Sequence, residues 1–145
     1  MRKVNLFAPD LDLVCDRDGY RRRAASIGTQ VGAEQIGAAL YELGDGERTF
    51  PYHFHHGMEE WVLVVDGAPT LRTPDGERTL RRGDVQCFPP GADGAHQLRG
   101  PGTVLLLSAN RSPETIEYLD SGKIGVSPPG RVWRAADAVD YWEGE

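Results

Sequence analysis

The chain has 145 residues, the length of one domain built around a single buried core. Its net charge of −6 at pH 7 and the small size of its arginine-rich patches argue against a nucleic-acid partner. The longest apolar runs, such as Val62–Val65, are far shorter than the about 20 residues of a membrane-spanning helix, so no membrane partner is expected. The N-terminal residues carry no signal-peptide pattern, and we therefore expect a cytoplasmic protein.

Short strands separated by turns fill the middle of the chain, after a stretch of mixed charge and glycine at residues 1–36. That first stretch is expected to form an early strand that pairs with another edge, or a lid. Eighteen glycines and ten prolines punctuate the whole chain, which is typical of an all-β protein. The expected strands are Ala38–Leu43, Tyr52–His55, Trp61–Val65, Thr70–Thr73, Glu77–Leu80, Asp84–Phe88, Gln97–Arg99 and Thr103–Ser108.

The turns between these strands indicate a sandwich or barrel. The segment TPDGE contains Asp75-Gly76, a pair that supplies the positive φ angles of a tight hairpin. Eight short strands at this spacing predict an all-β sandwich or barrel with little helix. Residues 109–145 are expected to form an extended tail that docks on the body through Trp133, Tyr141 and Trp142, with one short helical turn within Arg134–Val139.

The stretch HFHHGMEEW, which begins at His53, holds three of the four histidines and two adjacent glutamates. Residues i and i+2 of a strand point to the same face, so His53 and His55 can converge on one metal while His56 points away. A hairpin can return the carboxylate of Glu60 beside His55, whereas the same alternation turns Glu59 outward. The pattern predicts a metal site that includes His53, His55 and Glu60.

The fourth histidine, His96, follows a second punctuated segment, GDVQCFPPGADGAH. A strand is expected to end at Pro89-Pro90-Gly91, and His96 begins the next one. At one hairpin from the HFH pair in a small barrel, its imidazole is a candidate for the remaining ligand.

These two segments resemble the two motifs of the cupin superfamily, G-x5-H-x-H-x3-4-E-x6-G and G-x5-P-x-G-x2-H-x3-N. His53, His55, Glu60 and Gly67 match the first motif at the required spacing, with six residues rather than five between Gly46 and His53.

The second motif departs more from the pattern. Gly83, Pro89 and Gly91 match, but four residues rather than two precede His96, and Gly100 stands where the pattern has asparagine. The longer spacing leaves two arrangements open: His96 is displaced from the metal, or the extra residues bulge outward.

The resemblance covers about residues 38–108 and implies a double-stranded β-helix (jelly-roll) barrel. Residues 1–145 then form one cupin domain, with a core at about 38–108, a docking tail at 109–145 and extended N- and C-terminal segments. Pro69–Glu77 and Thr115–Val126 are also similar to a group of small bacterial single-domain cupins. The metal ligands that the resemblance implies are His53, His55, Glu60 and His96, and the metal is one divalent transition ion, such as Fe, Mn, Ni or Zn.

The resemblance implies two classes of function. One is a metal-dependent enzyme, of dioxygenase, isomerase or lyase type, on a small organic acid, sugar or aromatic metabolite; the other is a non-catalytic small-molecule binding or sensing protein. No catalytic residue is assigned, although His56, Tyr52 and Tyr41 are candidates for an acid or base near the mouth. No motif for an organic cofactor is assigned.

The strand that contains Trp61, Leu63 and Val65 is apolar on both faces, so its outer face needs a cover. The N-terminal segment, the C-terminal tail or a second subunit could supply it. Small cupins are often dimers, and a homodimer is expected.

Overall fold

Eight strands lie where the alternation of apolar and polar residues predicts them. In the computed structural model, which describes residues 1–145, their ends differ from the expected ones by one or two residues at most. The prediction of an all-β barrel is confirmed. These strands are β3 (Ile36–Leu43), β4 (His53–His55), β5 (Glu60–Gly67), β6 (Thr70–Thr73), β7 (Gly76–Thr79), β8 (Val85–Phe88), β9 (Gln97–Arg99) and β10 (Gly102–Ala109).

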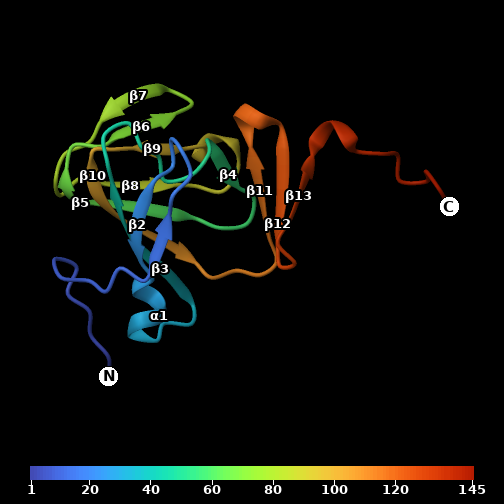
Figure 1. Ribbon diagram of the computed structural model, residues 1–145. Coiled ribbons are helices and arrows are strands. Elements are labelled where there is room, and N and C mark those ends of the chain that lie inside the picture. The colour runs from blue at the N-terminus through green and yellow to red at the C-terminus, as the bar shows by residue number, and fades with distance from the viewer.

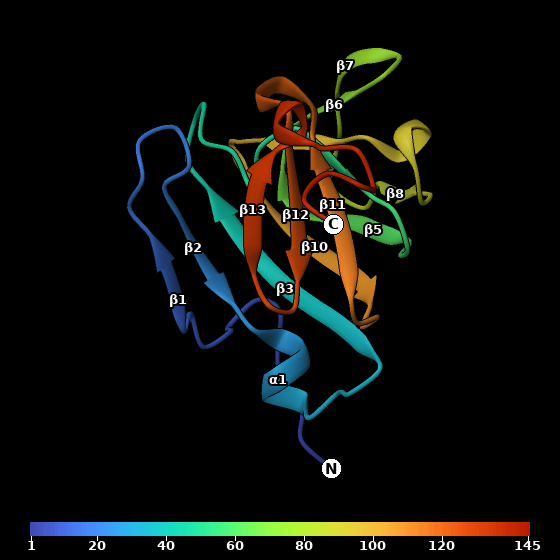
Figure 2. The ribbon, with the colours of Figure 1, turned by 90° about the vertical axis from the view of Figure 1, so that its right-hand side faces the viewer.

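The strands form three antiparallel sheets. The six-stranded sheet has the order β1-β2-β3-β10-β5-β8, where β1 is Leu13–Cys15 and β2 is Arg22–Ala25. A second sheet, β13-β12-β11-β4, contains β11 (Glu114–Tyr118), β12 (Lys123–Ser127) and β13 (Arg131–Arg134), and stands across from the first (Figure 2). The small sheet β7-β6-β9 is joined to β4 by an isolated bridge between His53 and His96.

The main core fills the space inside the barrel. Val62 and Val64 of β5 point inward and are almost completely buried, because alternate residues of a strand face the same side. Burial of side chains of this size is the largest favourable contribution to folding, roughly 1.5–3 kcal/mol each. The other members of this cluster are Leu43, Leu71, Leu80, Phe88, Leu98, Val104 and Leu106, with Tyr41 and Phe50 packed against it.

The N-terminal segment covers the outer face of the six-stranded sheet. Leu63 and Val65 pack there with Ile27 of the short helix α1 (Ile27–Val31) and with Leu6 (Figure 1). The first of the three possible covers is therefore the one observed, although Trp61 remains 44% exposed. No helix in the structure is long and apolar enough to span a bilayer.

The glycine that ends the first motif lies at a point where no side chain fits. Gly67 has a φ of +79° and lies directly opposite Gly102 of β10. A Cβ atom at Gly67 would lie 2.6 Å from the Cα atom of Gly102, so both the backbone conformation and the space require glycine.

The C-terminal region differs from the expected docking tail. Strand β11 pairs directly with β4, so residues beyond 108 complete the second sheet rather than only lying on the body. The expectation that the tail aromatics pack is wrong: Trp133, Tyr141 and Trp142 are 46%, 82% and 72% exposed. They stay in solvent because β13 is an edge strand and the residues after it run away from the barrel (Figure 1). The expected helical turn is present at Ala135–Asp137.

Candidate metal centre

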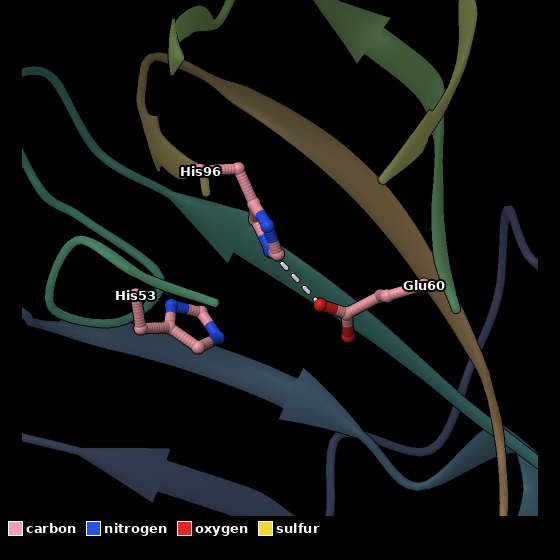
Figure 3. A group of neighbouring side chains, drawn as sticks. All are labelled: His53, Glu60 and His96. Atoms are coloured by element: carbon pink, nitrogen blue, oxygen red, sulfur yellow. Dashed lines mark ion pairs between the residues drawn. The ribbon is translucent and has the colours of Figure 1, made fainter. Parts of the chain in front are cut away.

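Three of the four residues expected to bind metal lie together inside the barrel. One ligand atom from each of His53, Glu60 and His96 lies within 4.8 Å of the others, and all three side chains point toward one another (Figure 3). His53 and His96 are 5% and 2% exposed. A group of nitrogen and carboxylate ligands this close and this buried is a possible site for one divalent transition metal.

The backbone brings the second motif to the first. His53 and His96 form an antiparallel bridge in which each backbone N–H donates to the other residue's carbonyl. The two extra residues of the second motif are taken up by a 3₁₀ turn, Ala92–Gly94, in which Ala92 and Asp93 are exposed. Of the two arrangements left open by the longer spacing, the structure therefore has the outward bulge.

Backbone carbonyls fix the orientation of two of the imidazoles. Nδ1 of His53 lies 2.8 Å from the carbonyl oxygen of Pro51, and Nδ1 of His96 lies 2.9 Å from that of Gly94. A carbonyl oxygen only accepts, so Nδ1 carries the hydrogen in both rings, and in the neutral ring Nε2 is a free lone pair. The ring of Phe88 stacks on His96 at 3.9 Å and further restricts it. Both histidines thus present Nε2 to the centre of the cluster.

The ligand atoms of this cluster carry lone pairs and the negative charge of one carboxylate. Nε2 of His96 is 2.9 Å from Oε2 of Glu60, yet the atom is buried without a hydrogen-bond partner. Burial lowers the pKa of His53 to about 4, and the neighbouring imidazoles of His96 and His55 act in the same direction. Burial alone would raise the pKa of Glu60, but hydrogen bonds from the rings of His55 and His96 and the positive charge of these rings when protonated outweigh it and lower that pKa to about 2. Glu60 is therefore anionic at neutral pH, and a carboxylate with imidazole nitrogens around it suits a bound cation.

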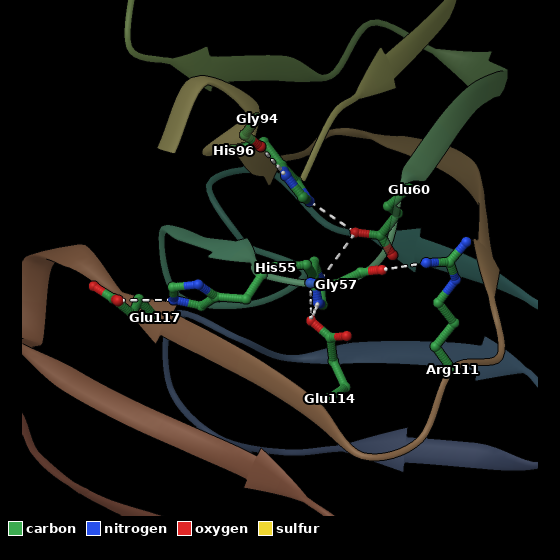
Figure 4. Close-up of polar contacts among 9 residues, drawn as sticks. His55, Gly57, Glu60, Gly94, His96, Arg111, Glu114 and Glu117 are labelled. Atoms are coloured by element: carbon green, nitrogen blue, oxygen red, sulfur yellow. Dashed lines mark hydrogen bonds and ion pairs between the residues drawn. The ribbon is translucent and has the colours of Figure 1, made fainter. Parts of the chain in front are cut away.

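His55 lies at the edge of this group. Its Nε2 is 3.6 Å from Oε2 of Glu60, and its ring centroid is 5.0 Å from that of His53. On the other side, its Nδ1 is 3.5 Å from Oε1 of Glu114, a buried carboxylate on β11 that also accepts a hydrogen bond from Gly57 N–H at 3.3 Å (Figure 4). A carboxylate behind a histidine is the usual way in which proteins orient a metal-binding imidazole.

Glu114 was missed by sequence reasoning because it lies outside both motifs. Only the pairing of β11 with β4 brings it beside His55. Alternation along β11 places Ile116 and Tyr118 on the same face, and the ring of Tyr118 stacks with that of His53 at 6.1 Å. The neighbouring residues Thr115–Val126 resemble small single-domain cupins, but no pattern in this segment indicates these contacts.

The remaining candidates lie away from the cluster. His56 is on the outer face, where its Nε2 forms a hydrogen bond with Oε1 of Glu117 at 2.8 Å, and the exposed Glu59 accepts a hydrogen bond from the indole of Trp61. The division of HFHHGMEEW into inward and outward residues was thus predicted correctly. Tyr52 packs in a separate small apolar cluster.

A cavity of about 290 Å³ reaches the carboxylate of Glu60 from the side of α1 and β3. Its wall also contains Tyr41, Ser108 and Asn110. Burial raises the pKa of the Tyr41 phenol, and the negative charge of Glu60 adds to the shift. Tyr41 therefore stays protonated at neutral pH and can donate a hydrogen bond to a molecule in this cavity.

Comparison with known proteins gives one family and several similar structures. The profile of the Cupin domain family matches residues 39–110, the region that carries both motifs. No curated protein sequence matches the chain significantly.

Two crystal structures are similar over most of the chain. One is described provisionally as a sugar phosphate isomerase, from Acidithiobacillus ferrooxidans; it is 26% identical, with a TM-score of 0.77 over 84% of this chain and 81% of the other. The second, described as a sugar phosphate isomerase of the cupin superfamily from Silicibacter pomeroyi, is 25% identical, with a TM-score of 0.80 over 94% of both chains. A polyketide cyclase from Streptomyces resistomycificus, 24% identical with a TM-score of 0.60 over 79% of this chain and 83% of the other, shares the fold.

Proposed function

Since the chain belongs to the cupin superfamily, we propose that it is a metal-dependent enzyme, of isomerase or lyase type, that acts on a small organic acid or sugar. The barrel would hold one divalent transition metal, such as Fe, Mn, Ni or Zn, through His53, Glu60 and His96, with His55 as the fourth ligand. A dioxygenase and an aromatic substrate fit the fold equally but have no further support from the comparisons.

The observation that carries this proposal is the buried Nε2 of His96. It faces Oε2 of Glu60 at 2.9 Å without a hydrogen bond, while Nδ1 of the same ring is already bound to a carbonyl. Two atoms with lone pairs at this distance repel each other unless a cation or a proton lies between them. Because burial opposes a positive charge on His53, and Nδ1 of His96 already donates to the carbonyl of Gly94, a metal ion is the better counter-charge.

Such a metal would supply Lewis acidity toward a carbonyl or hydroxyl oxygen of the substrate. Residues of the protein would bind and orient the substrate. Tyr41 holds a proton at its hydroxyl inside the cavity that reaches Glu60. Ser108 and Asn110 line the same cavity and offer neutral hydrogen bonds to hydroxyl groups. The two similar structures described as sugar phosphate isomerases support a polyhydroxylated substrate. Fold similarity alone does not decide the reaction.

The test is metal analysis of purified protein together with variants of the cluster. We expect one metal per chain, and a loss of metal affinity of at least about 100-fold in His53→Ala and His96→Ala, because removal of a ligand exceeds the 10–100-fold effect of an outer partner. The matched control is His56→Ala, a neighbouring histidine whose ring is exposed and pairs with Glu117.

Three results would separate the alternatives. Equal metal content in His53→Ala, His96→Ala and His56→Ala would refute the site. Metal binding with turnover of no sugar or organic acid, but with saturable binding of one, would indicate the non-catalytic binding protein instead. Turnover that is lost on chelation and restored by one metal would support the enzyme.

A further inference from the structure

Two cations face the inside of the barrel and have no carboxylate partner. Arg22 of β2 lies opposite Leu43 in the β2–β3 register, and Leu43 belongs to the inner core, so both side chains share the inner face. Lys123 of β12 lies opposite Tyr118, whose ring stacks with His53, so Lys123 shares the face of the metal cluster. Each is partly buried, and neither forms an ion pair, whereas the outward Arg23 pairs with Glu42 at 2.6 Å.

Each cation is held over an aromatic ring that in turn contacts His53. The guanidinium of Arg22 is 4.8 Å from the ring centre of Phe50, and Phe50 is 6.0 Å from His53. The ammonium of Lys123 is 5.5 Å from the ring centre of Tyr118, and Tyr118 is 6.1 Å from His53. One cation comes from each of the two large sheets, and each is one aromatic ring away from the cluster.

Arg22 and Lys123 line one groove of about 400 Å³ between these sheets. Its single carboxylate, that of Asp120, is already engaged by both terminal nitrogens of Arg72 at 2.7 and 2.9 Å. Arg17 is the third cation of the wall. The groove therefore carries net positive charge on a chain whose total charge is −6.

We propose that this groove is an anion subsite, in which Arg22 and Lys123 hold a phosphate or carboxylate group of the substrate. Assigning the anion to the substrate rests on the proposed metal-dependent function. It requires a substrate that reaches from the groove past the ring of Phe50, which lines the groove, to His53 in the cluster. An arginine can bind such a group through two nitrogens, and a lysine adds a point charge. The substrate class becomes a small acid or sugar that carries an anionic group at one end.

The experiment is a calorimetric titration of inorganic phosphate into the metal-free protein, so that no metal–phosphate contact contributes. We expect saturable binding that Arg22→Gln and Lys123→Gln each weaken about tenfold, the usual effect of losing one charge-assisted hydrogen bond. The matched control is Arg131→Gln, an exposed arginine on β13, which should change the affinity by no more than about twofold. If Arg22→Gln fails to fold, as judged by circular dichroism, Arg22→Lys and Lys123→Gln carry the test.

Acetate, titrated in the same way, distinguishes the two sources of the anion. Preference for phosphate indicates a phosphorylated substrate, and preference for acetate a carboxylate. Saturable binding of neither anion, or equal affinity in wild type, Arg22→Gln and Lys123→Gln, overturns the subsite. Because the titration uses metal-free protein, it tests the anion subsite separately from the proposed enzyme. If the chain takes up no metal but binds phosphate in a way that depends on Arg22, the metal-dependent enzyme is refuted and the anion subsite is supported.

Discussion

Replacement of Glu114 tests whether a carboxylate outside both motifs orients a metal ligand. Its side chain is 5% exposed, and its Oε1 atom lies 3.5 Å from Nδ1 of His55 and accepts a hydrogen bond from the backbone N–H of Gly57 at 3.3 Å. Glu114→Gln keeps the shape and one acceptor oxygen but removes the charge. Glu114→Ala removes the acceptor as well.

The size of the effect follows from these two contacts. Loss of a carboxylate behind a metal-binding histidine lowers metal affinity by about 10–100-fold, so we expect about tenfold for Glu114→Gln and about 100-fold for Glu114→Ala. The alanine variant also removes the acceptor of the Gly57 N–H, a part-buried hydrogen bond that contributes about 0.5–1.5 kcal/mol to the unfolding free energy.

Two measurements separate orientation from simple stability. Metal affinity is measured by competition with a chromophoric chelator, and unfolding free energy by urea denaturation of the metal-free protein. The control is Glu117→Gln, which changes a glutamate on the outer face of the same strand that pairs with the exposed His56. If Glu114→Gln binds metal as tightly as Glu117→Gln, the orienting role is refuted; a loss of stability alone would make Glu114 only a structural residue.

Three further predictions concern pH, backbone and assembly. Because the pKa of His53 is about 4 in the folded protein and about 6.5 in the unfolded chain, the unfolded state binds more protons between these values. Urea denaturation of metal-free protein should therefore show that the unfolding free energy decreases by about 3 kcal/mol as pH falls from 6.5 to 4. The same dependence of unfolding free energy on pH in His53→Gln would contradict this cause. Gly67→Ala should lower unfolding free energy by at least about 2 kcal/mol, and clearly more than Gly46→Ala, whose φ is also positive but whose Cβ has open space. If the exposed outer face at Trp61 is buried in a homodimer, light scattering gives twice the 15.9 kDa of one chain, and Trp61→Glu halves that mass; a monomeric wild type contradicts the dimer.

The first motif could be interpreted almost completely from the sequence because its geometry is local. A strand alternates with a period of two, so His53 and His55 on one face and His56 on the other follow from their numbering alone. Because the turn between the two strands is short, a hairpin is expected to return the carboxylate of Glu60 to the side of His55. The eight strands were predictable for a similar reason, since most of them are separated by short turns that contain glycine or proline.

His96 shows where such local reasoning ends. Its distance from the first motif in the sequence does not fix its position; the bridge to His53 and the outward turn at Ala92–Gly94 do. His55 fits the spacing of the motif, but the motif does not indicate which residue lies on the other side of its ring. In the structure that residue is Glu114.

The amino-acid sequence by itself determined the pattern of the eight middle strands, the inward and outward faces of the first motif, and the residue types able to bind a metal. Only the tertiary structure decided what surrounds them: Glu114 behind His55, Tyr41 beside Glu60, and Arg22 and Lys123 on the rings that flank His53. Periodicity controls which face of a strand a side chain takes, and it acts over a few residues. The pairing of β11 with β4 and of β2 with β3 joins residues far apart in the chain, and no local pattern specifies which strands become neighbours.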